Sequence, residues 1–361
     1  MDKLRIGMVG TSWYADLMHL PILKSHANAQ ITAICGRNRA RADEMAAKYE
    51  IPHVFTDYRE MLDKVKLDAV VIAVPDNMHY PISMAALDAG LHVLCEKPMA
   101  SNLQQAKAML VKAEAIQVKH MVYFTYRWMP QVRYMQQLLS EDFLGKPYHA
   151  HFQYIEGYGR KPQYQWKWDS AYGLGILGDL GSHMIDLARL ALGEVARVQA
   201  HLVTHVHRPN PQGTTYDPAC DAAMLTLQFK NGAHATIQVS AVAQVGEHRA
   251  ILYGEKGALD LNYWFDSPFS VRVARNDEDA FQVLPIPAEL VGGVDENQPW
   301  FPRAIQLFTQ PSFGTRAFVD CIIEDKPATP NFFDGVKAQA VIDAAIAADR
   351  SGAWVDVESE S

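Results

Sequence analysis

The sequence predicts an α/β Rossmann domain followed by an α+β domain with a large, mostly antiparallel open sheet. Apolar runs alternate with helical patterns over the first third of the chain, and strands of alternating polarity with a hairpin turn follow after about residue 125. A chain of 361 residues also exceeds what one hydrophobic core usually organises. We therefore place two domains at residues 1–124 and 125–361, and we leave open whether the C-terminal segment packs back on the first.

The first domain is predicted from strand-like runs that are apolar almost throughout. They lie at residues 4–9, 30–35, 69–74, 92–95 and 120–124, with a weaker run at 53–55. Helical spacing of apolar residues separates them, most clearly at 40–49 and 102–116. Strands that are apolar on both faces and alternate with helices indicate a parallel sheet covered on both sides, which is a doubly wound domain.

The second domain is predicted from alternating polarity. Residues 221–229 and 233–241 alternate, and Asn231-Gly232 between them is the two-residue turn favoured in hairpins. Further strand-like runs lie at 249–253, 258–261 and 270–273, and helices are expected at 180–192, 303–324 and 334–351. This grouping predicts a mostly antiparallel sheet with helices on one face.

Composition excludes several classes of function. The net charge is −8 and Lys and Arg are spread along the chain, so the sequence has no electrostatic footprint for nucleic acid or an anionic membrane. No window approaches the roughly 20 apolar residues of a membrane span, and the first apolar run is too short for a signal peptide. The four cysteines lack metal-ligand spacing, so we expect buried thiols in a reducing cytoplasm and no metal site.

A glycine turn at residues 10–15 stands where the first strand should lead into the first helix. In the GxGxxG/A dinucleotide fingerprint, Gly10 would make the tight turn and Ala15 would allow close helix packing, while Ser12 replaces the middle glycine. Serine is small enough for a pyrophosphate to approach, and helix N-terminal amides can hold phosphates. The alternative is an ordinary glycine-capped turn.

The end of the second strand bears on the choice between NAD and NADP. An acidic residue there usually meets the 2′-hydroxyl of NAD, whereas a 2′-phosphate needs positive charge. Residues 35–39 contain no acid, and Arg37 could pair with a phosphate. The sequence therefore favours NADP. The alternative is that Arg37 is a solvated loop charge and that NAD binds through the backbone and Asn38.

Four further segments carry a family resemblance. They are Val-Pro-Asp-Asn-Met-His at 74–79, Cys-Glu-Lys-Pro at 95–98, Tyr-Arg-Trp at 126–128 and Gly-Asp-Leu-Gly-Ser-His at 178–183. With the turn at 10–15 they resemble the Gfo/Idh/MocA family, which includes glucose-fructose oxidoreductase and inositol dehydrogenases. The resemblance covers nearly the whole chain, and the Glu-Lys-Pro and Asp-x-Gly-x-His motifs are specific in this order and spacing.

Lys97 is the first candidate for chemistry. Hydride transfer from a carbinol carbon needs a held cofactor, a group that takes the hydroxyl proton, and positive charge near the developing alkoxide. Lys97 follows a predicted parallel strand, at the edge where open α/β sheets bind ligands, so its ammonium could donate to the reacting oxygen. The alternative is a lysine that only extends from a strand end into solvent. The resemblance implies that Lys97 is catalytic and that the Lys97–Pro98 bond is cis.

Asp179, His183 and Asp186 share one face of a helix that would begin near Gly178. Spacing alone favours a solvated surface, with Asp179 as an N-cap. The glycine-rich approach at 173–178 and the titration range of histidine favour a site instead. The resemblance implies that His183 is the general acid/base and that Asp179 orients the substrate hydroxyl or His183.

The motifs and the resemblance together define the expected site, whose catalytic residues are Lys97, Asp179 and His183. The expected cofactor-binding residues are Gly10, Thr11, Ser12, Trp13, Tyr14, Arg37, Asn38, Val74, Pro75, Asn77, His79, Glu96, Lys97 and Arg127. The expected substrate-binding residues are Lys97, Arg127, Trp168, Asp179 and His183. Alternatives stay open for three of them: Glu96 pairs with Lys97 or a helix terminus, His79 caps the following helix, and Trp168 packs in a core or an interface.

The resemblance implies an NAD(P)-dependent oxidoreductase that transfers a hydride between nicotinamide and a hydroxyl-bearing carbon of a sugar, inositol or related cyclic alcohol. Two alternatives are an NAD-dependent glycosidase that acts by transient oxidation and elimination, and a non-catalytic ligand sensor. The presence of Lys97, Asp179 and His183 together argues against a sensor. The expected partners are a small carbohydrate or polyol and further copies of the chain in a homodimer or homotetramer. We expect two loops to determine substrate specificity, at 154–172 and at 205–217. The first of them includes Tyr158.

Overall fold

The computed structural model describes residues 3–265, 267–275, 277–311 and 313–358. The chain divides into two compact units, and each is described by itself. The first unit comprises Met1–Tyr123 and Ala304–Val336, and the second comprises Phe124–Arg303 and Lys337–Ser361. Residues 304–336 thus belong to the first unit, whereas the predicted second domain comprised 125–361, with the question left open whether its C-terminal segment packs back on the first.

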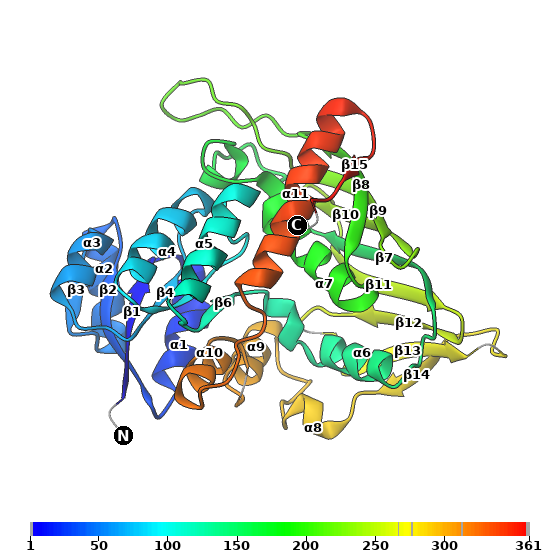
Figure 1. Cartoon of the computed structure of the whole chain (residues 1–361), viewed down its shortest axis with the longest axis horizontal. Helices are drawn as coiled ribbons and strands as arrows, with labels where there is room; N and C mark the ends of the chain where they lie inside the picture. The colour runs from blue at the N-terminus through cyan, green and yellow to red at the C-terminus, as the bar shows by residue number, and fades with distance from the viewer. Residues whose placement is uncertain (1–2, 266, 276, 312, 359–361) are drawn as a thin grey trace. The chain divides into compact units, whose positions relative to one another are not determined.

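The first unit is built on a six-stranded parallel sheet (Figure 1). In spatial order its strands are β3 (His53–Phe55), β2 (Ala29–Cys35), β1 (Leu4–Val9), β4 (Ala69–Ile72), β5 (His92–Cys95) and β6 (His120–Val122). The order 3-2-1-4-5-6 is that of dinucleotide-binding folds, and it confirms the predicted doubly wound sheet. All four residues of β4 are buried, as expected for an apolar strand that is covered on both faces.

Two groups of helices pack on this sheet. A π-helical turn (Ala15–His19) leads into α1 (Leu20–Lys24), which packs against α2 (Arg39–Tyr49) and α10 (Gly314–Ile323). The other group consists of α3 (Tyr58–Lys64), α4 (His79–Asp88) and α5 (Leu103–Ala115). Helices on both sides explain why the strands of this unit read as continuous apolar runs in the sequence.

The prediction of one continuous helix at 303–324 is wrong. The structure has α9 (Trp300–Phe308) and a separate α10, with Pro311 between them. Proline has no backbone N–H and cannot continue a helix, and Gly314 takes a φ of +49° where α10 begins. The helix expected at 334–351 is confirmed as α11 (Phe332–Ser351).

The second unit contains a nine-stranded sheet, which confirms the predicted large, mostly antiparallel sheet. In spatial order its strands are β14 (Gln282–Pro285), β13 (Ser270–Arg275), β12 (Gly257–Asn262), β11 (Glu247–Gly254), β7 (Pro147–Ile155), β10 (His234–Ser240), β9 (Ala222–Phe229), β8 (Val195–Val203) and β15 (Val355–Asp356). Among the described residues its neighbouring strands pair antiparallel except β7 and β10, which pair parallel. Three strands of this sheet, β7, β8 and β14, were not predicted from the sequence.

One face of this sheet is covered by α6 (Pro130–Ser140) and α7 (Ser182–Leu192), which pack on its central strands. In β10, Ala235, Ile237 and Val239 are buried, whereas the residues between them are exposed. Successive side chains of a strand point to opposite faces, so the second face of the sheet is open as far as the described residues go. The expectation of helices on one face is confirmed.

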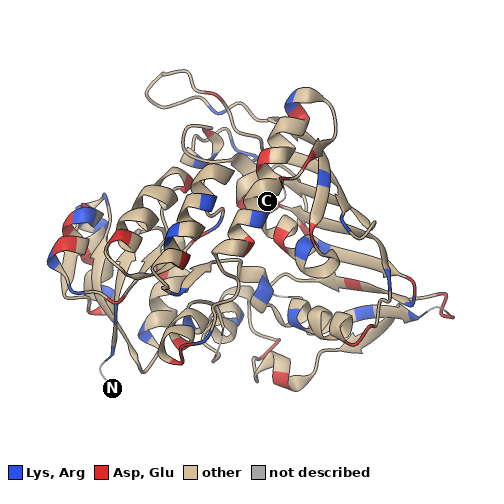
Figure 2. Ribbon diagram, viewed as in Figure 1, with Lys and Arg blue, Asp and Glu red and all other residues tan. Residues whose placement is uncertain are grey.

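Three properties of the described residues bear on function. None of their helices is both long and apolar enough to cross a membrane. Cys35, Cys95, Cys220 and Cys321 are free thiols, and no group of three or more His, Cys, Asp or Glu in this part of the chain is arranged to hold a metal ion. Figure 2 shows basic and acidic residues interspersed over both units.

Candidate active site

The turn after β1 requires a glycine and leads directly into a helical turn. Gly10 has a φ of +125°, and a Cβ atom there would lie 2.0 Å from the carbonyl oxygen of Ala73, just after β4. Only glycine fits such a position. The Ser12 hydroxyl accepts a hydrogen bond from the Ala15 amide at 3.1 Å, and Trp13 beside it is 70% exposed. Backbone amides at the start of a helix are the groups that bind a pyrophosphate in dinucleotide folds.

The tip of β2 presents Arg37 to solvent. A Cβ on Gly36 would lie 2.4 Å from the Thr11 side chain, so this tip and the glycine turn are in close contact. The Asn38 side chain accepts a hydrogen bond from the Arg41 amide at 3.1 Å and caps α2. Within the described residues no carboxylate forms an ion pair with Arg37. The exposed guanidinium is therefore the cation that this tip offers to a ligand.

His79 joins the loops that follow β4 and β5. Its Nδ1 lies 2.7 Å from the carbonyl oxygen of Pro98, and its Nε2 lies 2.9 Å from that of Val74. The side chain is buried, and burial lowers the pKa of His79. The helix α4 begins here without a side-chain cap, so the capping alternative is wrong. Pro75 and Asn77, in the same loop, are half-buried.

Glu96 and Lys97 follow β5 directly, and Glu96 has a partner that the sequence did not reveal. Its Oε1 lies 2.8 Å from Nε2 of His19, whose Nδ1 lies 2.8 Å from the Thr315 hydroxyl. Its Oε2 accepts a hydrogen bond from the Lys97 backbone amide at 3.2 Å. His19 is 77 positions from Glu96, so no spacing pattern could have linked them. The Lys97–Pro98 bond is cis, as the resemblance implied.

In the second unit, a π-helical turn (Leu177–Gly181) carries Asp179 and runs directly into α7, which carries His183 and Asp186. His183 is 6% exposed and Asp186 is 1% exposed, so the interpretation as a solvated face is wrong. Asp179 lies inside the turn, whose N-cap is Ile176, so the N-cap interpretation is also wrong. The ring of Tyr126 meets the His183 ring edge to face at 4.9 Å between centroids. His183 and Asp186 therefore lie in the interior, while Asp179, in the turn before α7, is partly exposed.

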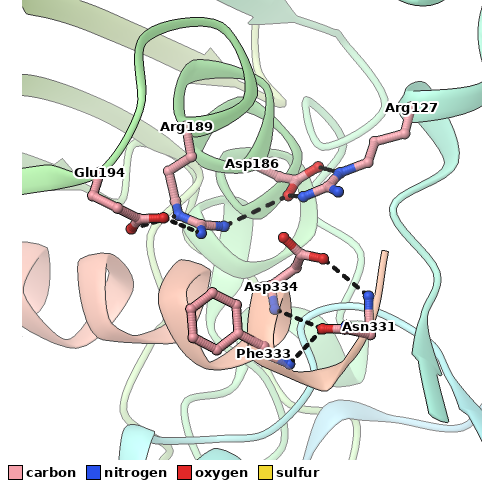
Figure 3. Close-up of polar contacts among 7 residues, drawn as sticks. All are labelled: Arg127, Asp186, Arg189, Glu194, Asn331, Phe333 and Asp334. Carbon is pink, nitrogen blue, oxygen red and sulfur yellow. Dashed lines mark hydrogen bonds and ion pairs between the residues drawn. The ribbon is translucent and has the colours of Figure 1, made fainter. Parts of the chain in front are cut away.

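Figure 3 shows where Arg127 is directed. Its Nε and Nη2 donate hydrogen bonds to the two carboxylate oxygens of Asp186, at 2.8 and 2.6 Å. Asp186 also lies 3.9 Å from Arg189, which binds Glu194 at 2.7 Å. A two-point bond of this kind is the arrangement in which guanidinium and carboxylate bind most strongly. The expected contact of Arg127 with cofactor or substrate stays a prediction.

Asp179 has two partners in the loop that precedes it. The Tyr158 hydroxyl donates a hydrogen bond to Oδ2 at 2.7 Å, and Nζ of Lys167 lies 2.5 Å from the same oxygen. The Tyr158 side chain is 42% exposed, but its hydroxyl lies against the carboxylate. Burial of this hydroxyl and the neighbouring Asp179 carboxylate raise the pKa of Tyr158 well above its ordinary value, so the hydroxyl is a donor at neutral pH. Tyr158 lies in the loop that was expected to bind the substrate. Lys167 was not predicted, because nothing in its spacing marks it as a partner of Asp179.

Trp168 does not present its ring for stacking on a sugar, which corrects the expectation that it binds the substrate directly. The side chain is 1% exposed. Tyr158 stacks on it with ring centroids 6.0 Å apart, and the guanidinium of Arg208 lies 4.4 Å from its ring centroid. Arg208 in turn pairs with buried Asp221 at 3.0 Å. Trp168 therefore packs against the ring of Tyr158 and supports it.

Comparison with known proteins decides the family. Residues 4–124 match the "Oxidoreductase family, NAD-binding Rossmann fold", and residues 132–260 match the "GFO/IDH/MocA C-terminal domain". The chain belongs to the Gfo/Idh/MocA oxidoreductase family. This finding confirms the resemblance stated from the motifs and the prediction of an oxidoreductase with a dinucleotide-binding Rossmann domain.

Two relatives and one solved structure show what proteins similar to this chain bind or act on. Levoglucosan dehydrogenase of Pseudarthrobacter phenanthrenivorans is 27% identical over 407 residues, covering 99% of this chain and 99% of the relative. A structure of levoglucosan dehydrogenase in complex with NADH and L-sorbose has a TM-score of 0.86 and 25% identity, covering 100% of both chains. The scyllo-inositol 2-dehydrogenase (NADP(+)) of Bacillus subtilis is 34% identical over 141 residues, which are 38% of this chain and 42% of the relative.

Proposed function

We propose that this enzyme transfers a hydride between the nicotinamide of NAD(P) and a hydroxyl-bearing carbon of a sugar, an inositol or a related cyclic alcohol. The observation that carries the proposal is that each unit holds proton-handling side chains in a defined position within that unit. Lys97 follows β5 at the carboxyl edge of the NAD-binding sheet, Asp179 is held by two donors, and His183 is buried on α7. The names of the relatives, which include a levoglucosan and a scyllo-inositol dehydrogenase, support the substrate class.

Each side chain has a role in this reaction. The bound nicotinamide supplies the hydride acceptor in oxidation and the donor in reduction. In oxidation, His183 takes the hydroxyl proton while the carbon loses its hydride and becomes a carbonyl, and in reduction His183 returns the proton. The ammonium of Lys97 donates to the reacting oxygen and stabilises its negative charge. Asp179 accepts a hydrogen bond from a substrate hydroxyl and so orients the ring.

The test is a screen of levoglucosan, D-glucosides, free hexoses and inositols with NAD and with NADP, following the absorbance of the reduced nicotinamide. At least one compound should reduce one cofactor. Lys97→Ala should lower kcat by about 10²–10³-fold, because a donor to the developing oxyanion is lost. The matched control Lys66→Ala removes an exposed lysine of the same unit and should keep wild-type rates.

Two outcomes of the screen would overturn the proposal. One is that no compound is turned over and direct titration shows no binding of either cofactor. The other is that a glycoside is cleaved without net formation of reduced nicotinamide, which would assign the same residues to elimination chemistry.

We infer that NADP is the preferred cofactor, supported by the exposed Arg37 at the tip of β2 and the lack of an acid in residues 35–39. Arg37→Ala should raise the Kd of NADPH by about tenfold, or 1.4 kcal/mol, and leave that of NADH nearly unchanged, because only NADPH has the 2′-phosphate. Fluorescence titration of the two reduced cofactors measures this. Arg350→Ala, an exposed arginine of α11, is the control. Equal losses for both cofactors would contradict the assignment, and tighter binding of NADH by the wild type would reverse it.

We also propose that the chain forms a homodimer or homotetramer through the open face of the nine-stranded sheet. The three adjacent strands β7, β10 and β9 contain no Asp, Glu, Lys or Arg. An exposed sheet face without charge is a surface that natural proteins usually cover.

The four free thiols support a reducing compartment such as the cytoplasm.

A further inference from the structure

The Asp179 carboxylate is held by more donors than a simple acid/base motif would need. Tyr158 and Lys167 both bind Oδ2, at 2.7 and 2.5 Å. The side chains of Lys167 and Asp179 are 24% and 22% exposed, so the pair is only partly screened by solvent. Two donors on one oxygen, one of them charged, fix the plane of the carboxylate.

Tyr158 is itself fixed by a chain of packed groups. Its ring stacks on Trp168 with an angle of 27° between the planes, and Arg208 lies on Trp168 at 4.4 Å. Arg208 and Asp221 form an ion pair in which both side chains are at most 1% exposed. Breaking a buried pair of this kind is costly, so the support is rigid.

Lys167 is fixed by the loop that carries it. It lies in a one-turn 3₁₀ helix (Trp166–Trp168), directly before the buried Trp168. Asp169, the next residue after Trp168, accepts hydrogen bonds from the Tyr164 hydroxyl at 2.9 Å and the Ala171 amide at 3.0 Å. The ammonium of Lys167 also lies 5.1 Å from the ring centroid of Tyr158. Lys167 and Tyr158 thus form one preorganised holder for Asp179.

We propose that Lys167 is a positioning residue that, together with Tyr158, holds the Asp179 carboxylate in the orientation that accepts a substrate hydroxyl. This inference rests on the proposed function. Because the ammonium is bound to Asp179, its charge is compensated by that carboxylate and Lys167 acts through it. The compensated charge favours a neutral polyhydroxylated ring over an anionic substituent at this position.

The first test separates binding from chemistry. A contact made equally in the ground state and the transition state changes KM and leaves kcat nearly unaltered. Lys167→Met should therefore raise KM about tenfold and change kcat less than about threefold, measured with levoglucosan or whichever screened polyol the wild type oxidises fastest. Lys167→Arg should restore KM to within about threefold, because a guanidinium also binds carboxylate. Lys230→Met, at an exposed hairpin turn, is the matched control and should behave as wild type.

The second test asks whether Lys167 acts through Asp179. Substrate affinity is measured by calorimetry on enzyme loaded with the reduced cofactor, which binds the alcohol without turnover and so does not need an active variant. In the Asp179→Asn background, Lys167→Met should weaken binding by less than about twofold, because groups that act through one atom are not additive. A tenfold loss in both backgrounds would show direct contact with the substrate and overturn the inference.

Other outcomes also decide whether the positioning role of Lys167 and the proposed function stand. A wild-type KM in Lys167→Met, or a Lys167→Arg enzyme no better than Lys167→Met, would overturn the positioning role while the proposed function stands. A wild type that oxidises no compound of the screen would overturn the proposed function and the inference with it.

Discussion

His120 lies at the start of β6, and its ring is held in the neutral form. Its Nδ1 accepts a hydrogen bond from the Phe332 backbone amide at 3.1 Å, and the two rings lie 4.9 Å apart. A ring nitrogen that accepts a hydrogen bond carries no proton. Burial lowers the pKa of His120 to about 4. The folded chain therefore resists protonation of this residue.

We expect the free energy of unfolding to fall as the pH decreases from 6.5 to about 4, in part through His120. The unfolded residue binds a proton below 6.5, whereas the folded residue does so only near 4, so protons stabilise the unfolded chain in this window. The loss over this window is at most about 3–4 kcal/mol, at about 1.4 kcal/mol per pH unit. His120→Asn keeps an acceptor that does not titrate, so urea unfolding should show a smaller loss in the variant. Parallel pH curves for the two proteins would contradict this.

Asp186 shows why residue spacing alone was misleading. Three polar residues on one helical face are usually solvated, yet this carboxylate is 1% exposed. A buried charge is tolerated when it is paired, and Arg127 supplies the pair from 59 positions earlier in the chain. A partner at that distance leaves no periodic signal, so burial of the motif followed from the fold and not from the helix pattern.

At the scale of elements, the turn between β1 and the first helix depends on Gly10. Alanine there would have a Cβ 2.0 Å from the carbonyl oxygen of Ala73 at a φ of +125°. We expect Gly10→Ala to raise the Kd of the reduced cofactor at least about tenfold and to destabilise the chain by about 1–3 kcal/mol, because the turn must move.

Gly90→Ala is the matched control for this substitution. Gly90 also has a positive φ, +73°, but no atom lies within 4 Å of the added Cβ. It should lose stability from backbone strain alone and bind the cofactor as wild type does. Wild-type cofactor affinity in Gly10→Ala, measured by the same titration, would show that the close approach to Ala73 does not shape the site.

How well a strand was predicted from the sequence depended on whether both of its faces are buried. The strands of the first unit are covered on both faces and read as apolar runs, so they were predicted with small errors at their ends. β7 alternates Ala150 and Phe152 with His149, His151 and Gln153, and its pattern was not recognised as a strand. β15 has two residues and pairs with β8 at the edge of the sheet, and so short an element carries no pattern of its own.

At the scale of the whole molecule, the open face of the nine-stranded sheet leads to a prediction about assembly. Met224 is 55% exposed on this face, in β9, which like its neighbour β10 carries no Asp, Glu, Lys or Arg. Met224→Arg should shift the protein from a dimer or tetramer to a monomer, because two copies would bring their arginines together in a desolvated interface. Light scattering after size exclusion measures the mass. Val111→Arg, on α5 and 66% exposed, is the control and should keep the wild-type mass. A monomeric wild type would contradict the proposal.

The sequence by itself determined the doubly wound unit, the mostly antiparallel sheet and the family, because strand and helix periodicity, the Gly10 turn and the two motifs are local patterns. Only the tertiary structure decided which side chains are partners. His19 meets Glu96 across 77 positions, and Lys167 and Tyr158 meet Asp179 from an irregular loop. Such pairs are set by how the chain packs, and packing has no fixed spacing along the sequence.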